Sequence, residues 1–255
     1  MCKDGSAPWP ARSDAPTEQV PTAVRLSDAG WSDPSVGVWD PATRTGTLTR
    51  DLDSALQVDS DGLTLDGAGH TIRGTGSGKG VYLEGRSGVT VRNLTVQGFV
   101  YGVYLYMATD NTLTGITAVG NTRNGFHLSY ASGNTLAGNT ARANSYDGIY
   151  IEYSSLSTLS HNTAQDNGYN GINLNAAGMG TLTGNTASGN RQHGLLLNAA
   201  GANTLFGNVL TGNTYNVRID GTSDYHFNQT LDTTNLVDGK PVTSIRPLTT
   251  EKRAG

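Results

Sequence analysis

The chain has 255 residues with a formal net charge of -4, from 17 basic and 21 acidic side chains. No nucleic-acid partner is expected, because phosphate backbones are bound by clustered Lys and Arg and no basic stripe is present. No apolar run approaches the roughly 20 residues that cross a bilayer, so no membrane span is expected either. The 34 glycines and the low hydrophobic content of 36% favour a fold with many tight turns around a narrow core.

Residues 1–22 are predicted to form a disordered linker, because they are polar and Pro-rich and lack apolar periodicity. The only cysteine, Cys2, follows the first Met. This position is typical of a bacterial lipoprotein whose signal peptide has been removed, and Cys2 would then carry a lipid anchor. The alternative is an artificial chain boundary or an incidental free thiol.

Residues 23–60 lack the repeat described below and contain Trp31 and Trp39. We predict an N-terminal cap here, because an uncapped repeat end would expose its core and unpaired backbone groups. Residues 61–222 are predicted to form the repeats. Residues 223–255 are predicted to form a C-terminal cap and a tail.

A glycine recurs every 22 or 23 residues, and a short alternating apolar run follows each one. These glycines are Gly80, Gly102, Gly125, Gly148, Gly171 and Gly194. So short a repeat cannot bury its own apolar face and must stack on copies of itself. Because it is rich in Gly and Asn and has no helical pattern, we predict an all-β, single-stranded parallel β-helix, a solenoid of about seven coils with a cap at each end.

Alignment of the coils separates core columns from polar columns. A period of two places alternate side chains inside, and one predicted core column contains Leu113, Leu136, Leu159, Leu182 and Leu205. Asparagines recur with the same spacing and are predicted to form structural ladders from coil to coil. These ladders contain Asn121, Asn144, Asn167, Asn190 and Asn213, and Asn139, Asn162, Asn185 and Asn208.

The outward positions of one strand depart from a plain repeat, because aromatic and hydrogen-bonding side chains follow one another from coil to coil. Tyrosine offers a flat apolar face to sugar C–H groups and a hydroxyl to sugar oxygens, so we predict a glycan-binding groove. The predicted substrate-binding residues are Tyr82, Tyr104, Tyr106, Asn124, Asp147, Glu152, Tyr153, Asn175 and His193. The alternative is a solvated sheet face on which tyrosine occurs through its β-propensity.

The segment 66–72 (DGAGHTI), the recurring Asn-Thr-Leu and Gly-Asn-Thr-Ala units and the terminal segment 233–242 (TTNLVDGKPV) resemble NosD-like proteins and carbohydrate-active β-helix enzymes. The resemblance implies a right-handed parallel β-helix, an extracytoplasmic location (periplasmic, cell-surface or secreted) and a polysaccharide or cell-surface glycan as partner. Proteins with this helix include polysaccharide lyases, C5-epimerases, glycosidases and proteins without catalysis, so the fold does not choose among them.

Removal of the C5 proton of a uronate needs a base, a group that neutralises the carboxylate, and an acid. His127, Asn173 and Tyr150 are of the right types and form the candidate catalytic set. Arg218 lies four coils from His127, roughly 19 Å by coil spacing, which is too far for the same subsite. The resembling epimerases carry an Asp-Pro-His motif that this chain lacks. We therefore interpret the chain as an exported polysaccharide-binding β-helix and leave two alternatives open: a uronate lyase or C5-epimerase, and a non-catalytic surface or scaffold protein.

Other chemistries have weaker support. The five histidines fall in different columns or distant coils, so no metal site is predicted, and the resemblance is not extended to copper. No cofactor is expected, with calcium at scattered acidic side chains as the alternative. Ice or surface binding through the column of Thr112, Thr135 and Thr158 is disfavoured, because the neighbouring column is uneven.

Overall fold

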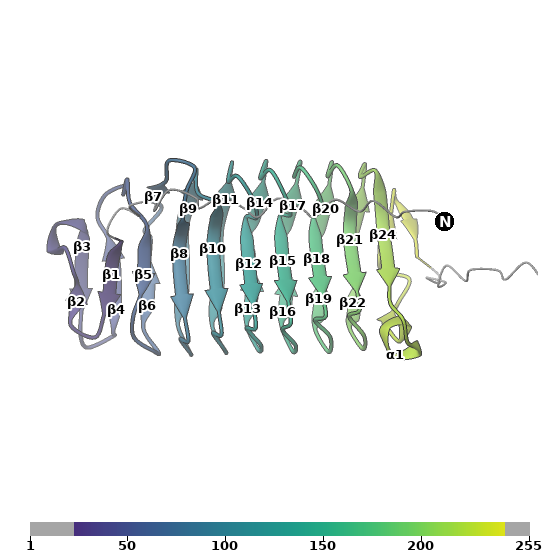
Figure 1. Cartoon of the computed structure of the whole chain (residues 1–255), viewed down its shortest axis with the longest axis horizontal. Helices are drawn as coiled ribbons and strands as arrows, with labels where there is room; N and C mark the ends of the chain where they lie inside the picture. The colour runs from purple at the N-terminus through teal and green to yellow at the C-terminus, as the bar shows by residue number, and fades with distance from the viewer. Residues whose placement is uncertain (1–22, 243–255) are drawn as a thin grey trace, which may run out of the picture.

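The computed structural model describes residues 23–242, which form one elongated stack of coils (Figure 1). The predictions for residues 1–22, including Cys2, and for the tail after residue 242 lie outside the described residues.

Each coil contributes one strand to a long parallel sheet, here called sheet A. Its parallel strands are β1 (Val24–Ser27), β5 (Leu56–Val58), β8 (Lys79–Glu84), β10 (Tyr101–Tyr106), β12 (Phe126–Ser129), β15 (Ile149–Glu152), β18 (Ile172–Asn175), β21 (His193–Asn198) and β24 (Tyr215–Asp220). The strands from β8 to β24 stand side by side in the register predicted from the repeat, for example Tyr104 beside His127 and His127 beside Tyr150. β1 and β5 continue the same sheet into the segment 23–60.

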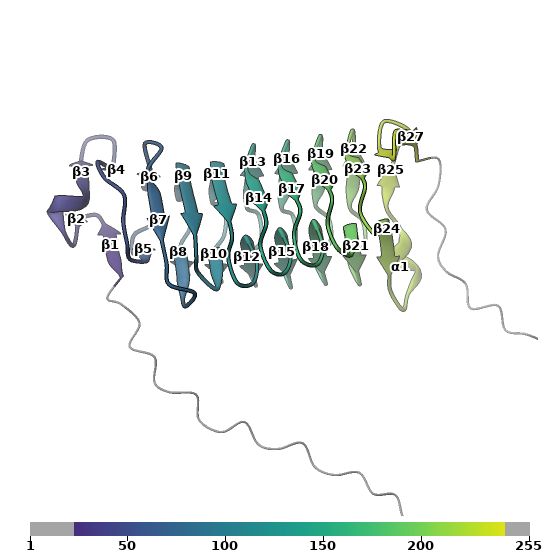
Figure 2. The ribbon, with the colours of Figure 1, turned by 90° about the horizontal axis from the view of Figure 1, so that it is seen from above.

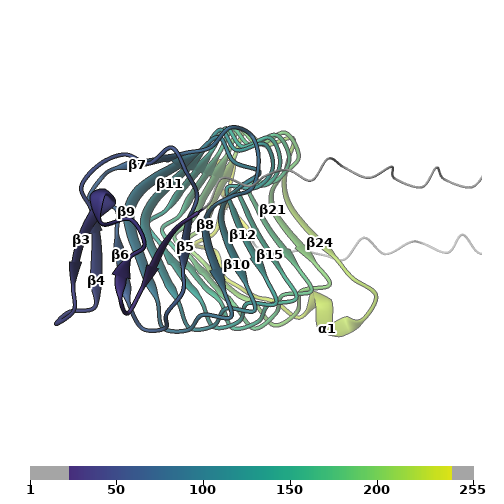
Figure 3. The same ribbon diagram turned by 60° about the vertical axis from the view of Figure 1, so that its left-hand side comes forward.

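The return path of each coil forms two further rows of short strands, which face sheet A across the core (Figure 2). The first row contains β4 (Thr45–Leu48), β6 (Thr64–Asp66), the start of β9 (Thr90–Gln97) and of β11 (Thr112–Val119), β13 (Thr135–Ala137), β16 (Thr158–Ser160), β19 (Thr181–Thr183), β22 (Thr204–Phe206) and β25 (Thr230–Leu231). The second contains β7 (Thr71–Arg73), the ends of β9 and β11, β14 (Thr140–Arg142), β17 (Thr163–Gln165), β20 (Thr186–Ser188), β23 (Val209–Thr211) and β26 (Leu236–Val237). The rows meet at a left-handed residue, such as Gly138 with φ 62°. The coil therefore has three faces (Figure 3).

The core is a continuous column of apolar side chains. Leu113, Leu136, Leu159, Leu182 and Leu205 are all buried in one stack, as predicted.

The asparagine ladders are buried and bonded in both directions. The Asn144 amide nitrogen donates to Asn167 Oδ1 at 3.0 Å and to the Ala118 carbonyl at 3.1 Å. Its Oδ1 accepts from the backbone N–H and the amide of Asn121 at 3.1 and 2.9 Å. A side chain at Gly125 would place its Cβ only 2.7 Å from the Asn144 amide nitrogen. The repeated glycine is therefore required by close packing against the ladder.

Both ends of the stack depart from the repeat. At the N-terminal end β2 (Gly30–Trp31) runs antiparallel to β1, β3 (Gly37–Asp40) pairs with β4, and Trp31 is buried. At the other end α1 (Asp224–Phe227) follows β24, and β27 (Lys240–Pro241) pairs with β26 through a turn with left-handed Asp238 and Gly239. The fold is the predicted all-β, right-handed parallel β-helix.

Replacement of one core leucine tests the stacking. Leu159→Ala should lower the free energy of unfolding by about 2–5 kcal/mol, because a rigid stack cannot collapse around the cavity. Chemical denaturation followed by circular dichroism measures this. Thr158→Ala on the outward side of β16 is the control and should change stability by less than about 1 kcal/mol. Equal losses in the two variants would contradict a tightly packed core.

Candidate functional site

Outward side chains of β8, β10, β12 and β15 form a continuous aromatic strip on sheet A. The ring centroids of Tyr82 and Tyr104 lie 5.7 Å apart, those of Tyr104 and His127 4.9 Å, and those of His127 and Tyr150 5.0 Å. Each ring packs against the next because the in-register strands place equivalent side chains one coil apart. The strip is thus a preformed surface that leaves His127 only 7% exposed.

His127 is the centre of a hydrogen-bond network across neighbouring coils. Its Nε2 lies 3.1 Å from Glu152 Oε1, and its Nδ1 lies 3.4 Å from the Asn124 amide nitrogen. The Tyr150 hydroxyl donates to Glu152 Oε2 at 3.0 Å and accepts from the Asn175 amide at 3.0 Å. The network assigns the tautomer of His127: Nε2–H donates to the Glu152 carboxylate, and the lone pair is on Nδ1.

Burial sets the protonation of these groups. It lowers the pKa of His127 below its usual range, and Glu152 partly opposes this effect by stabilising the imidazolium. Burial also raises the pKa of Tyr150 to about 12. At neutral pH the network therefore presents a neutral imidazole beside a protonated phenol.

A second polar group lies at the corner that precedes β15, in the same coil as Tyr150. Asp147 is almost completely buried, and its Oδ2 accepts from the Asn173 amide at 3.0 Å. Its Oδ1 accepts from the backbone N–H and the side-chain amide of Asn170, both at 2.9 Å. Burial raises the pKa of Asp147, and the amide hydrogen bonds oppose the shift.

Two hollows open on this face of sheet A. One of about 290 Å³ is lined by residues that include Arg123, His127, Asp147, Tyr150 and Asn173. The other, of about 250 Å³, is lined by Gln57, Lys79 and Tyr82 among others. They occupy opposite ends of the aromatic strip, so together they form an elongated surface of several coils at about 4.8 Å per coil.

Two basic residues border the strip and were not predicted from the sequence. The Lys79 ammonium lies 3.8 Å from the centroid of the Tyr82 ring and 4.6 Å from that of Tyr104. The Arg123 guanidinium donates to the Tyr101 hydroxyl at 2.9 Å and lies 5.8 Å from the Tyr146 ring centroid. The sequence did contain a pattern that could have identified Arg123. Arg123, Tyr146 and Tyr169 follow one another at 23-residue spacing, two residues before the repeated glycine of each coil.

The remaining predicted residues lie around this centre. Tyr106 contacts Tyr130, whose ring stacks on exposed Tyr153 with centroids 5.0 Å apart. Asn124 and His193 belong instead to a buried corner ladder: Asn124 Oδ1 accepts from the Asp147 backbone, and His193 Nδ1 lies 3.0 Å from Asn170 Oδ1. Asn175 reaches the centre through Tyr150.

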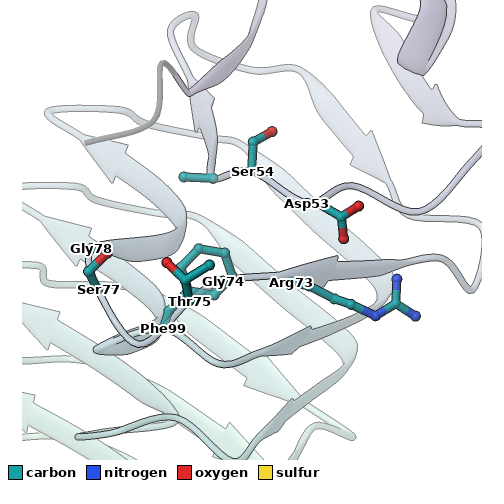
Figure 4. A pocket seen from close by; sticks show the side chains of 9 residues that line it. Asp53, Ser54, Arg73, Gly74, Thr75, Ser77, Gly78 and Phe99 are labelled. Carbon is teal, nitrogen blue, oxygen red and sulfur yellow. The ribbon is translucent and has the colours of Figure 1, made fainter. Parts of the chain in front are cut away.

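A small pocket at the turn before β8, lined by Asp53, Arg73, Thr75 and Phe99 among others, is separate from the strip (Figure 4). Its volume of about 30 Å³ is far smaller than that of either hollow on sheet A.

The family follows from the sequence match. Residues 51–243 match the family model described as "Periplasmic copper-binding protein (NosD)". The chain belongs to the NosD family. No curated protein matches the sequence.

Solved structures share the fold of this NosD-family chain at low identity. The periplasmic alginate epimerase AlgG has 18% identity and a TM-score of 0.64 over 76% of this chain and 50% of its own. Pectate lyase Pel9A has 20% identity and a TM-score of 0.60 over 72% of this chain and 54% of its own. The mannuronan C-5 epimerase AlgE4 A-module of Azotobacter vinelandii has 16% identity and a TM-score of 0.53 over 76% of this chain and 66% of its own. The matched region spans about half the length of AlgG and Pel9A.

Copper binding, which the family description names, has no matching donor set in residues 23–242 of this chain. No group of three or more His, Cys, Asp or Glu side chains in that range could hold a metal ion. The described part of the chain also contains no helix long and apolar enough to cross a membrane.

The His127 environment predicts its titration. NMR should show His127 titrating below 6.5, because desolvation is the largest effect on its imidazolium. Glu152→Gln should lower this pKa further, because it removes the carboxylate that stabilises the charged ring. A midpoint above 6.5 in the unaltered protein, or a rise in the variant, would contradict the burial and pairing described above.

Proposed function

We propose that this chain binds an anionic polysaccharide along the aromatic strip, outside the cytoplasm. The observation that carries the proposal is the combination of stacked tyrosines with Lys79 and Arg123 at the edges of one elongated surface. Aromatic faces suit the C–H faces of sugar rings, and the two cations would pair with carboxylates. The structures that share the fold include a pectate lyase, an alginate epimerase and a mannuronan C-5 epimerase, which supports a uronate polymer as the ligand.

The family description supports an extracytoplasmic location, since it names a periplasmic protein. A lipid anchor at Cys2 remains a prediction from the sequence, as do the boundaries of the linker, the caps and the tail. A non-catalytic surface or scaffold protein would use the same binding surface without turnover.

The network around His127 favours a second function, β-elimination of a bound uronate. The long 3.4 Å contact from the Asn124 amide would give way on substrate binding, and His127 Nδ1 would accept the C5 proton while Glu152 holds the opposite ring nitrogen. The C4–O bond would break as the C4=C5 double bond forms, and the Tyr150 hydroxyl would give its proton to the leaving oxygen. His127 and Tyr150 lie side by side on the same face of sheet A, so they approach the sugar from one side. This arrangement fits a lyase better than an epimerase.

The roles of the candidate catalytic residues differ from those suggested by the sequence alone in one respect. One N–H of the Asn173 amide donates to Asp147, and the negative charge of Asp147 beside it disfavours a substrate carboxylate at this position. We assign carboxylate neutralisation to Arg123, which lines the same hollow as His127.

Binding is tested by removing one contact of each kind. Tyr150→Ala and Arg123→Gln should each weaken binding to oligogalacturonate or oligomannuronate at least tenfold, measured by isothermal titration calorimetry. The Arg123→Gln variant should also show a weaker dependence on salt, because one ion pair is lost.

Arg142→Gln on β14, on another face, is the charge-matched control and should leave affinity unchanged. Affinities that stay equal in all three variants would place the glycan elsewhere on the molecule.

Catalysis is tested by incubating the protein with alginate, pectate and glucuronan in deuterated water. A lyase produces the ultraviolet absorbance of unsaturated ends, whereas an epimerase incorporates deuterium at C5. His127→Asn should reduce turnover about a hundredfold or more, and activity should rise with pH through the low pKa of His127. Measurable binding without either product would leave the non-catalytic function as the better account.

A further inference from the structure

Asp147 occupies a position where the neighbouring coils carry amides. The equivalent residues before and after it are Asn124 and Asn170, and the three form one hydrogen-bonded corner ladder. An asparagine at position 147 would supply the same ladder acceptor through its Oδ1. The ladder therefore does not require the charge of Asp147.

The charge of Asp147 is costly where it lies. The side chain is 1% exposed, and no ion pair to it occurs within residues 23–242. A buried carboxylate without a basic partner is unfavourable unless hydrogen-bond donors surround it. Its Oδ2 receives only the Asn173 amide from the described residues, so it has capacity for a further donor.

Asn173 shows a matching deficiency. The side chain is only 8% exposed, and its Oδ1 is buried without a hydrogen-bond partner among the described residues. An unpaired buried polar atom of this kind is unfavourable, because it has lost its hydrogen bonds to water and gained none in the protein. Asp147 and Asn173 line the same hollow as Tyr150 and His127, so a side-chain rotation would bring these buried acceptors to a molecule bound there.

We propose that Asp147 and Asn173 form an acceptor notch that selects a sugar residue with unsubstituted ring hydroxyl groups. This inference rests on the proposed polysaccharide binding and specifies the ligand further. Both atoms that remain available, Asp147 Oδ2 and Asn173 Oδ1, accept hydrogen bonds, and a sugar hydroxyl donates one. An esterified hydroxyl has no proton to donate and is larger, so it leaves both acceptors unpaired.

The notch also fixes the orientation of a bound uronate. A substrate carboxylate is repelled by Asp147 and attracted to Arg123, which lines the same hollow. The sugar therefore directs its carboxylate toward Arg123 and its hydroxyl edge toward Asp147 and Asn173. Discrimination by buried polar groups is steep, because the wrong ligand leaves them without partners.

The experiment compares binding of an oligogalacturonate with that of the same oligomer O-acetylated on its ring hydroxyls. Saponification of the acetylated sample serves as a reversal control. The unaltered protein should prefer the free-hydroxyl form at least tenfold. Asp147→Asn should bring this preference close to one, because the new amide reverses the notch from acceptor to donor while keeping the ladder bond.

Asn173→Leu provides an independent variant, since the next coil already carries Leu196 at this position. It should lose the preference in the same way, with circular dichroism and melting temperature confirming the fold of both variants. Asp166→Asn, an exposed change of the same charge on another turn, should keep the full preference.

The outcomes separate the two proposals. Binding of the free-hydroxyl oligomer with an unchanged preference in a folded Asp147→Asn or Asn173→Leu variant would overturn the notch and leave the proposed function intact. Equal binding of both oligomers by the unaltered protein would do the same. Failure of the unaltered protein to bind any uronate oligomer would instead overturn the proposed function itself.

Discussion

The packing of the asparagine ladder against the repeated glycine is the constraint on which the rest of the structure depends. A Cβ on Gly148 would lie only 2.7 Å from the Asn167 amide nitrogen and 2.7 Å from the Gly171 carbonyl oxygen of the next coil. A shift of a ladder asparagine relative to its strands would break the ladder bonds and leave buried amides unpaired. The last coil keeps its Asn208–Asn235 bonds with 27 residues of separation, because it holds its extra residues in the segment around α1. The 23-residue spacing is therefore enforced in register along the central coils. Equivalent outward side chains fall one coil apart as a consequence, and the aromatic strip exists because of it.

Periodicity made much of this predictable from the sequence. It placed Tyr104, His127 and Tyr150 in one outward column because a regular repeat converts sequence spacing into spatial position. It could not show that Arg123, outside the strand, turns onto the rings of Tyr101 and Tyr146, since that depends on side-chain conformation at a corner. It also could not show that the Asn173 amide donates to Asp147, because the direction of an amide depends on the partner it finds.

In the proposed acceptor notch, one residue of a structural column takes on a second role in ligand binding. Asn124 and Asn170 satisfy the backbone of adjacent coils, and Asp147 between them does the same with one oxygen. The second oxygen is unnecessary for the coil and faces a hollow. A carboxylate in this position costs desolvation that an asparagine avoids, and the donors of Asn170 and Asn173 offset this cost only in part. A residue whose chemistry differs from that of the equivalent residues on neighbouring coils is thus a physical signal of a site.

The division between inward and outward columns explains how one helix can serve several chemistries. Core leucines, ladder asparagines and repeat glycines are fixed by packing, whereas an outward residue on sheet A contacts mainly its two neighbours on adjacent coils. Exchange of such a residue alters the binding surface with little effect on stacking. Structures with less than 25% identity can therefore share the fold of this chain, and activity must be argued from the outward columns alone. In this chain those columns present a neutral imidazole and a protonated phenol on a rigid sheet, with a guanidinium beside them. Such preorganisation is what binding and proton transfer both require.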